Sequence, residues 1–449
     1  MTNTRRKFLK QTALGTAGIT LSGIAFSPKS YARIMGANDR IRVGIVGFAD
    51  RSKYTLIPSF LHLSEKMNME ITTVSDIWNR RRDEAAQYFN EKGLSVKLAR
   101  NNEEMYDQKE VDAVIIATAD FQHALHAIEA VKAGCDAYVE KPFAETMEDN
   151  RNALKTIQAS DKIIQIGSQR RSGDNYVAAN EYIRSGKFGD ITMVEMSWNV
   201  NQPGRWRRPD LTSIIKESDT DWNRYLMNRP KDTWDPRKYI EYRLFWPYSS
   251  GIPGQWMCHQ IDTIHWFTGY QYPRSVAANG GIYMWDDGRT NNDTLTAVFD
   301  YGPLDNPKEG FQAVYSSRMH NSAGGIKELY YSNGGMLNLD TNKVTAEGGL
   351  TEGFARDMGM SANLLDDYEL PKMNVETASN TGTDPMTLAH MRNWMENLRS
   401  RKKTNADVMA GYNHSIAGIM TNAAIRTGAK AVFDPKKQEV MVNGKPFRY

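Results

Sequence analysis

The stretch Ile41-Arg42-Val43-Gly44-Ile45-Val46-Gly47 decides the fold that the sequence predicts. An apolar run that ends in glycine is typical of a buried parallel strand entering a tight turn. Residues 55–67 are predicted to be helical, and residues 70–76 form a second predicted strand that ends in Asp76. Strand, helix and strand in this order predict a βαβ unit and therefore a parallel sheet.

The same alternation continues to residue 167. Further helices are predicted at 79–92 and 122–133, and further strands at 96–98, 111–117, 136–139 and 162–167. Gly134 is placed to end the second of these helices, and Thr146-x-x-Asp149 is typical of a capping box. The predicted fold class is therefore α/β, with a doubly wound Rossmann domain over residues 38–167.

The second half of the chain is rich in β-type runs that mostly lack helices between them. Strands are predicted at 191–200, 275–285, 294–301, 311–319 and 328–331. Asn333-Gly334-Gly335 is a hairpin signal. We predict an α+β domain over residues 168–449 with a mostly antiparallel open sheet. Residues 348–383 are expected to be a long loop, and helices at 385–401 and 407–427 are expected to pack back on the domain.

The first 32 residues differ in character from the rest. Arg5 and Arg6 precede a mildly apolar run, and Ser30-Tyr31-Ala32 supplies the small residues that a signal peptidase needs. These parts resemble a twin-arginine (Tat) export signal, which predicts a periplasmic protein that is exported in its folded form.

The signal also accounts for the excess of positive charge. It holds five of the 56 basic residues and no acid, so the remaining chain has 56 − 5 = 51 basic against 53 acidic residues. Nothing therefore indicates a nucleic-acid partner, and no apolar run reaches membrane-spanning length. Cys135 and Cys258 are the only cysteines, so a disulfide framework is not indicated.

A candidate nucleotide turn follows the first strand. In Gly44-x-x-Gly47-Phe48-Ala49-Asp50-Arg51-Ser52, a full glycine-rich fingerprint would have glycine at positions 49 and 52. Asp76 ends the next strand, where it is expected to bind a ribose hydroxyl; the alternative is a turn aspartate. The predicted cofactor contacts from this region are Gly44, Gly47, Phe48, Ala49, Asp50, Arg51 and Asp76.

Two more segments are placed at the carboxyl edge of the parallel sheet, where ligands bind in such folds. Thr118 to His123 follows one strand, and His123 is either an anion-binding residue at a helix start or a packing residue. In Tyr138-Val139-Glu140-Lys141-Pro142-Phe143, proline stops the strand and leaves Glu140 and Lys141 at the edge. Their alternative is an ordinary surface ion pair.

A second cluster lies on a predicted helix at Trp256 to His265. His259, Asp262 and His265 fall within one broad face, and His259 is the best acid–base candidate because histidine titrates near neutral pH. We expect no metal site, since no second ligand cluster stands nearby. His265 is expected to be a packing residue.

Aromatic residues are dense between Arg205 and Tyr248, with Arg207, Arg208 and Arg243 among them. Two interpretations stay open at this point. The rings either pack an irregular segment or form a platform for a sugar, with arginines binding hydroxyls or a carboxylate.

Taken together, these motifs resemble the Gfo/Idh/MocA family of NAD(P)-dependent oxidoreductases, which includes glucose–fructose oxidoreductase and inositol dehydrogenases. The resemblance covers nearly all of the chain after the signal. It rests on these segments: Ala117-Thr118-Ala119-Asp120 with His123-Ala124, Val139-Glu140-Lys141-Pro142, Gln165-x-Gly167-x-Gln169-Arg170-Arg171, His390-Met391-Arg392-Asn393 and Ala406-Asp407-Val408.

The resemblance implies a nicotinamide along the edge that carries Lys141, with the lysine contacting the reacting hydroxyl. It assigns cofactor contacts to Thr118, Asp120, His123, Glu140, Lys141 and Gln169. Gln255 stands four residues before His259, where the family has an aspartate.

We therefore predict an exported oxidoreductase that acts on a secondary hydroxyl of a sugar and keeps its NAD or NADP tightly bound. His259 is the expected general base and Lys141 the group that stabilises the alkoxide, with Glu140 holding the lysine. Asp262 or Gln255 is expected to orient the histidine. Asp76 favours NAD, although Arg80 and Arg81 leave NADP open.

Two alternatives accompany this prediction. One is a redox-neutral, NAD-dependent enzyme that cleaves glycosides. The other is a catalytically silent sugar-binding protein, suggested by Gln255 and the incomplete glycine turn. The expected partners are a small-molecule sugar or glycoside and further copies of the chain, which are predicted to assemble through the C-terminal sheet.

Overall fold

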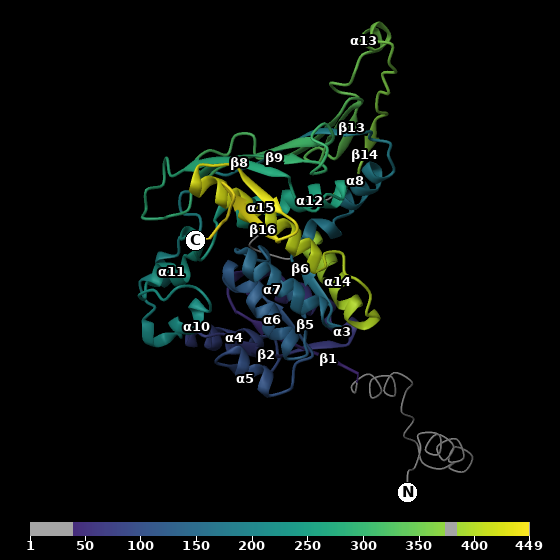
Figure 1. Cartoon of the computed structure of the whole chain (residues 1–449). Coiled ribbons are helices and arrows are strands. Elements are labelled where there is room, and N and C mark those ends of the chain that lie inside the picture. Colours follow the sequence, from purple (N-terminus) through teal and green to yellow (C-terminus); the bar gives the residue numbers. More distant parts are fainter. Residues whose placement is uncertain (1–38, 373–383, 449) are drawn as a thin grey trace, which may run out of the picture. The chain divides into compact units, whose positions relative to one another are not determined.

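The first sheet is built from the apolar runs that the sequence shows as strands. The computed structural model of the chain describes residues 39–372 and 384–448, so the predicted export signal lies outside the described residues. Within them, six parallel strands have the order β3-β2-β1-β4-β5-β6 (Figure 1). Their bounds are β1 Ile41–Val46, β2 Met69–Ser75, β3 Lys97–Ala99, β4 Ala113–Ile116, β5 Asp136–Val139 and β6 Ile164–Ile166. The doubly wound prediction is confirmed.

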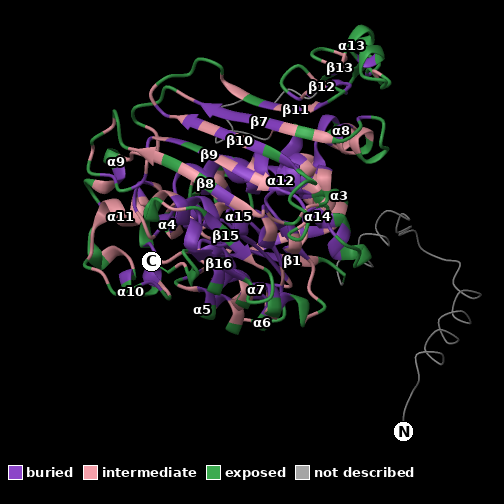
Figure 2. Cartoon of the chain, turned by 45° about the horizontal axis from the view of Figure 1, so that its top comes forward, coloured by how far each residue is buried: buried purple, intermediate pink, exposed green. Residues whose placement is uncertain are grey.

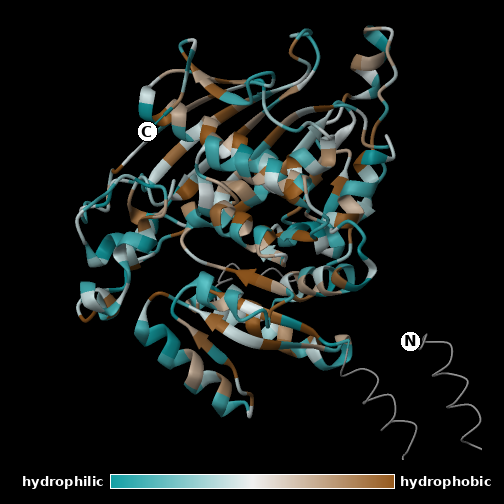
Figure 3. Ribbon diagram, turned by 60° about the horizontal axis from the view of Figure 1, so that its bottom comes forward, coloured by the Kyte–Doolittle hydropathy of each residue, from teal (hydrophilic) through white to brown (hydrophobic). Residues whose placement is uncertain are grey.

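Helices connect these strands, and all of them except Asn102–Asp107 fall where a helix is predicted. They are α3 Ile57–Met67, which follows a π-helical turn at Ser52–Leu56, α4 Asn79–Glu91, α5 Asn102–Asp107, α6 His123–Lys132 and α7 Met147–Gln158. Gly134, just past α6, has φ +85°, and the Thr146 side chain accepts a hydrogen bond from Asp149 N at the start of α7. Figure 3 shows apolar strands beside helices with hydrophilic outer faces.

The second sheet has eleven strands in the order β14-β13-β12-β11-β7-β10-β9-β8-β15-β16-β17. The bounds are β7 Ile191–Asn199, β8 Ser275–Gly281, β9 Thr294–Tyr301, β10 Phe311–Arg318, β11 Ile326–Ser332, β12 Gly335–Asn338, β13 Lys343–Thr345, β14 Tyr368–Glu369, β15 Ala431–Asp434, β16 Glu439–Val442 and β17 Lys445–Pro446. Pairing is antiparallel except between β7 and β10 among the described strands, and Ser332 pairs with Gly335 across the predicted hairpin.

Helices cover one face of this sheet. In β9 and β10, buried residues alternate with partly exposed ones, as Figure 2 shows along both strands. The buried side packs against α12 Cys258–Thr268 and α15 Val408–Thr427, while α14 Pro385–Ser400 lies on α3 of the first sheet. Residues from Ile41 onward thus form one compact unit.

The expectation of a featureless loop over 348–383 is wrong in part. This stretch contains α13 Glu352–Asp357 and the short strand β14, and residues 373–383 lie outside the described residues. Helix α13 stands out from the second sheet in Figure 1; it exposes Phe354 at 67%, and Met358, directly after it, is exposed at 72%. Across the described chain, none of the helices combines the length and hydropathy needed to traverse a bilayer.

Smaller helices and the last strands were not predicted. α8 Asp174–Arg184 follows the first sheet, and α9 Pro209–Thr212, α10 Trp222–Leu226 and α11 Pro236–Ile240 lie in the aromatic segment. Strands β15 to β17 are two to four residues long, too short to show a clear period in the sequence.

Helix α15 fastens the segment that follows Lys141. Phe143 N donates to His414 Nε2 at 3.3 Å and Ala144 N donates to Ser415 Oγ at 3.0 Å. The approach is close because position 411 is glycine: a Cβ there would lie 2.8 Å from Phe143 Cγ. The C-terminal helix therefore sets the position of the candidate active-site edge.

Replacing Gly411 with alanine should lower the free energy of unfolding by about 1–3 kcal/mol, because the methyl group overpacks against Phe143. Gly418 in the same helix is the matched control, since a Cβ there meets nothing within 4 Å. Gly418→Ala should raise stability by about 0.5–1 kcal/mol through helix propensity. Chemical denaturation measures both, and equal effects of the two variants would contradict the packing account.

Candidate active site

A single cavity of about 830 Å³ runs from the carboxyl edge of the first sheet to the region of α12. One end is lined by residues of the predicted nucleotide turn and sheet edge, including Gly47, Asp76, Thr118 and Lys141. The other end is lined by Trp198, Arg205, Trp206, Arg243, Trp256 and His259. The cavity brings together segments more than 200 residues apart in sequence.

The turn after β1 is tight, as the glycine predicts. Gly47 has φ +87°, and a Cβ there would lie 2.9 Å from Thr118 Cγ2. The Ser52 hydroxyl donates to Gly47 O at 2.6 Å, so serine closes the turn in place of the expected third glycine. The geometry leaves room for close approach of a ligand to the backbone.

Asp76 fastens this turn. Its Oδ2 accepts a hydrogen bond from Phe48 N at 2.8 Å, and its Oδ1 accepts one from Trp78 N at 2.9 Å. Burial raises the pKa of the carboxyl group, although both hydrogen bonds favour the charged form. Asp76 also lines the cavity, so the turn role and a ligand role coexist in one side chain.

Charges of the turn are neutralised by partners from elsewhere in the chain. Asp50, which would repel a diphosphate, pairs with Arg208 Nη1 at 2.5 Å. Arg51 Nε pairs with Glu140 Oε1 at 2.8 Å, and both Asp50 and Arg51 line the cavity together with Ala49.

Two predicted cofactor contacts are not in the cavity. Gly44 lies within β1, where a Cβ would be 2.7 Å from Met105 Sδ. The Phe48 side chain is fully buried in the core, with its ring 5.7 Å from that of Tyr88. Both residues shape the turn from behind, which corrects the prediction that they line the site.

Unpaired polar atoms mark the next stretch of edge. Thr118 Oγ1 and His123 Nε2 are buried and have no hydrogen-bond partner among the described residues, and both residues line the cavity. His123 Nδ1 lies 2.8 Å from Pro142 O, which places its proton there and leaves Nε2 as an acceptor. Burial lowers the pKa of His123. A polar ligand would satisfy these atoms.

Glu140 is buried at the end of β5. It contacts Arg51, and Gln169 Nε2 donates to its Oε1 at 3.2 Å. Burial favours the protonated acid, but the charges of Arg51 and Lys141 outweigh it and lower the pKa of Glu140. The carboxylate is therefore charged and held on both sides.

The ammonium group of Lys141 is held by a main-chain atom. Lys141 Nζ donates to Gln255 O at 2.8 Å, whereas only the backbone N of Lys141 donates to Glu140, at 3.2 Å. The expectation that Glu140 holds the lysine side chain is thus corrected. Burial lowers the pKa of Lys141, and Glu140 and Asp120 act against that shift.

The side chain of Gln255 forms hydrogen bonds with residues other than His259. Its Oε1 accepts from Arg243 Nε at 2.9 Å, and its Nε2 donates to Asp120 Oδ2 at 2.6 Å. Asp120 also accepts from Ser249 Oγ at 2.6 Å. Gln255 therefore joins Arg243 to Asp120 and does not orient His259.

His259 stacks on Trp198 from β7, with ring centroids 5.8 Å apart at 27°. Its imidazole has no hydrogen-bond partner within residues 39–372 and 384–448. Burial, followed by the positive charges of Lys141 and Arg170, lowers the pKa of His259 well below 6.5. The ring is neutral at physiological pH and has a nitrogen lone pair available as a base.

Asp262 has a structural partner. It accepts two hydrogen bonds from Arg171, at 2.7 and 2.9 Å, and lies 3.9 Å from His414 Nδ1. Burial opposes ionisation of Asp262, but Arg171 and His414 lower its pKa. This corrects the expectation that Asp262 orients His259. His265 packs as expected, with Nε2 3.0 Å from the Tyr301 hydroxyl.

The structure separates the two interpretations of the aromatic segment. Most of its rings form a buried cluster and serve packing: Trp222, Tyr225, Phe245 and Tyr248 with Phe121. Trp206, Tyr239 and Tyr242 line the cavity as well. Trp198 and Trp256 also line the cavity and were not predicted to do so, because the periodicity of a strand or helix does not indicate which ring faces a cavity.

Residues 41–168 match the model of the oxidoreductase family with NAD-binding Rossmann fold, GFO_IDH_MocA. An alpha-N-acetylgalactosaminidase of Shewanella oneidensis is 25% identical over 231 residues, and a glycosyl hydrolase family 109 protein of Shewanella pealeana is 26% identical over 230. Each match covers 45% of this chain, which spans about half the length of these relatives.

Solved structures share the fold over most of the chain. The WlbA dehydrogenase from Bordetella pertussis, in complex with NADH and UDP-GlcNAcA, has a TM-score of 0.60 at 17% identity, covering 88% of this chain and 99% of that one. The scyllo-inositol dehydrogenase from Lactobacillus casei has a TM-score of 0.58 at 17% identity, covering 87% of this chain and 97% of that one. At these identities the likeness concerns the fold alone.

Replacing Asp262 with asparagine should lower the free energy of unfolding by about 3 kcal/mol, because buried Arg171 loses its counter-charge. Asp161→Asn is the control, since Asp161 is exposed and solvent screens its pair with Lys162, so this change should leave stability nearly unaltered. The pH profile of any His259-dependent reaction should keep its acidic limb in Asp262→Asn. If the acidic limb moves in Asp262→Asn, the result would contradict this account and support the original expectation that Asp262 orients His259.

Proposed function

We propose that this chain, whose residues 41–168 belong to the Gfo/Idh/MocA oxidoreductase family, is an NAD-dependent enzyme acting on a secondary hydroxyl of a sugar or sugar derivative. One observation carries the proposal. A single cavity joins the turn after β1 to Lys141 and His259, so a dinucleotide and a hydroxyl substrate can meet at one place.

The residues present fit a dinucleotide. The Gly47 turn admits close backbone approach, and Thr118 Oγ1 and His123 Nε2 are buried polar atoms that still need partners. Asp76 lies at the end of β2, where it can accept a ribose hydroxyl. A nicotinamide bound here would supply a hydride acceptor.

Charge around β2 favours NAD over NADP. The Asp76 carboxylate would repel a 2′-phosphate. Arg80 and Arg81, which could have attracted that phosphate, both pair with Glu84, at 2.8 and 2.6 Å.

His259 and Lys141 have different roles in removing the hydroxyl proton. The neutral imidazole of His259 accepts the proton of the substrate hydroxyl. Lys141 Nζ, anchored by Gln255 O, retains further N–H groups to donate to the developing alkoxide. Trp198 limits water at the His259 ring and fixes its plane.

Cleavage of glycosides is the second candidate. The relatives that match about half of this chain are named as a glycosyl hydrolase family 109 protein and an alpha-N-acetylgalactosaminidase. Nitrophenyl glycosides separate the two: nitrophenol release without net NADH supports cleavage, and absorbance change only with a second sugar supports paired oxidation and reduction.

Export and assembly belong to the proposal too. An exported enzyme has to retain its cofactor, because free NAD is scarce outside the cytoplasm. Cell fractionation of a variant with both Arg5 and Arg6 replaced by lysine tests export, and retention of normal export would exclude the Tat route.

We also propose a homo-oligomer through the C-terminal sheet; light scattering that finds only monomers would exclude it.

Heat denaturation of the purified protein should release NAD, and little NADP, in a nearly equimolar amount. Chromatography of the supernatant measures both nucleotides. If none is released and added NAD and NADP do not bind, both enzyme proposals fail, and a catalytically silent sugar-binding protein becomes the better account.

The acidic limb of kcat/KM should lie below pH 6.5, because His259 must be neutral to accept a proton and its pKa is lowered.

Lys141→Met should reduce turnover strongly. It should also move the remaining acidic limb to higher pH, since a positive charge that lowers the pKa of His259 is gone. Lys132→Met is the control, because Lys132 is exposed in the last turn of α6. Undiminished turnover of Lys141→Met would contradict the assignment.

A further inference from the structure

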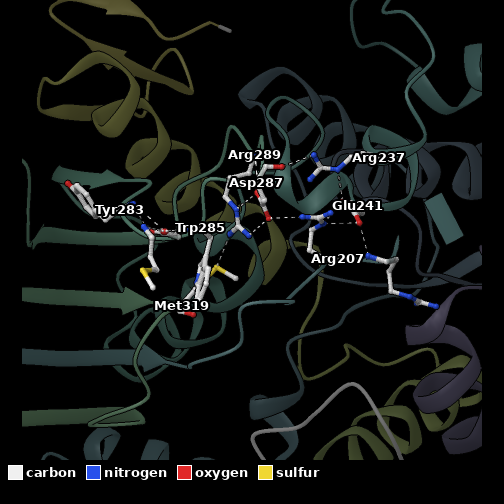
Figure 4. Close-up of polar contacts among 11 residues, drawn as sticks. Arg207, Arg237, Glu241, Tyr283, Trp285, Asp287, Arg289 and Met319 are labelled. Atoms are coloured by element: carbon white, nitrogen blue, oxygen red, sulfur yellow. Dashed lines mark hydrogen bonds and ion pairs between the residues drawn. The ribbon is translucent and has the colours of Figure 1, made fainter. Parts of the chain in front are cut away.

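Two arginines at the substrate end of the cavity lack a carboxylate partner. Among the described residues neither Arg205 nor Arg243 forms an ion pair, and both line the cavity. Their neighbours differ, as Figure 4 shows: Arg207, Arg237 and Arg289 each contact an acidic side chain, Glu241 or Asp287.

Arg205 has only neutral contacts. One guanidinium nitrogen, Nη1, donates to the amide oxygen of Gln202, and the guanidinium lies over the Trp256 ring at 5.5 Å. Its Nε is buried and has no hydrogen-bond partner among the described residues. Burial and the charge of Arg243 lower the pKa of Arg205 to about 10. This donor group is thus desolvated, charged and incompletely bonded.

Arg243 is held from one side only. Its Nε donates to the neutral Gln255 amide at 2.9 Å, and its guanidinium lies 4.6 Å from the Tyr242 ring centroid. Asp120 is the nearest acid in this chain of contacts, and it binds the other end of Gln255. No other side chain or carbonyl in the described part of the chain accepts a hydrogen bond from the remaining guanidinium nitrogens, which are left for a ligand.

The backbone beside Arg205 is strained. Trp206 has φ +66°, a conformation that non-glycine residues seldom adopt, and its ring lies 5.3 Å from Trp256. Such strain concentrates where a side chain must be held for function. Here it places Arg205 and Trp206 against the cavity.

We infer that the substrate carries an anionic group, a carboxylate or a sulfate ester on its sugar ring, which binds between Arg205 and Arg243. The inference rests on the proposed function and names its substrate class. A planar guanidinium offers paired N–H donors to either oxyanion, and an anion would relieve the repulsion between the two arginines. The rings of Trp206 and Trp256 lie beside it for the sugar face.

The contacts place this subsite on the substrate side. Arg205 lies over Trp256, Trp256 stacks on Trp198 at 6.1 Å, and Trp198 stacks on His259. A diphosphate is instead expected at the turn after β1, whose own arginine, Arg51, pairs with Glu140. The anionic group therefore belongs to the molecule that His259 deprotonates.

Titration calorimetry of the purified holoenzyme tests this with D-glucuronate, D-glucose 6-sulfate and D-glucose as probes, at fixed ionic strength. At least one anionic sugar should bind about tenfold or more tightly than D-glucose, and whichever it is identifies the anion. Arg205→Gln and Arg243→Gln should each weaken that binding by about 10- to 100-fold and leave D-glucose little changed. Arg205→Lys should keep part of the preference.

Arg207→Gln is the matched control. After this change Glu241 still forms its ion pair with Arg237, and Asp287 still forms its ion pair with Arg289. It should retain the full preference. Equal affinity for the three sugars, no binding of either anionic sugar, or the same loss in Arg207→Gln would overturn the inference. So would loss of bound NAD in Arg205→Gln, which would assign the arginine to the cofactor. Calorimetry measures binding and does not require turnover. A failure of the proposed reaction can therefore be distinguished from a failure of this inference.

Discussion

A buried carboxylate at the end of β5 is the constraint on which the site depends. Glu140 is 3% exposed and charged, and a charge at that depth is stable only with partners. Arg51 reaches it from the turn after β1, and Gln169 reaches it from the segment after β6. Position 167 has to be glycine, because a Cβ there would lie 2.9 Å from the Glu140 carboxylate. One acid thus ties three loops of the sheet edge together.

The two sheets are joined by the same region. Val139 of β5 and Ile166 of β6 belong to a buried cluster that also contains Val194 of β7 and Ile416 of α15. Because this core is continuous, the helix that supports the segment after Lys141 also covers the second sheet. The placement of Lys141 relative to His259 therefore follows from packing across the whole unit, and not from either sheet alone.

Much of the fold could be predicted from the sequence, because strands such as Ile41–Val46 and Thr294–Tyr301 carry their period and their turn signals locally. The sheet-edge residues that gather at the cavity, such as Thr118 and Lys141, could be predicted as well, since the carboxyl edge of a parallel sheet collects them. Side-chain partners could not. Asp262 is three residues from His259 in sequence but binds Arg171, and Gln255 binds Arg243 and Asp120, because burial and distant charges decide between equally near candidates.

The hydrogen bond from Lys141 Nζ to Gln255 O determines what position 255 can tolerate. A main-chain acceptor is present whatever amino acid occupies the position, so the anchor of the lysine is independent of the side chain at 255. That side chain can change its charge and its partners while the lysine stays in place. A glutamine at position 255 is therefore compatible with a correctly held lysine, and its side chain instead joins Arg243 to Asp120.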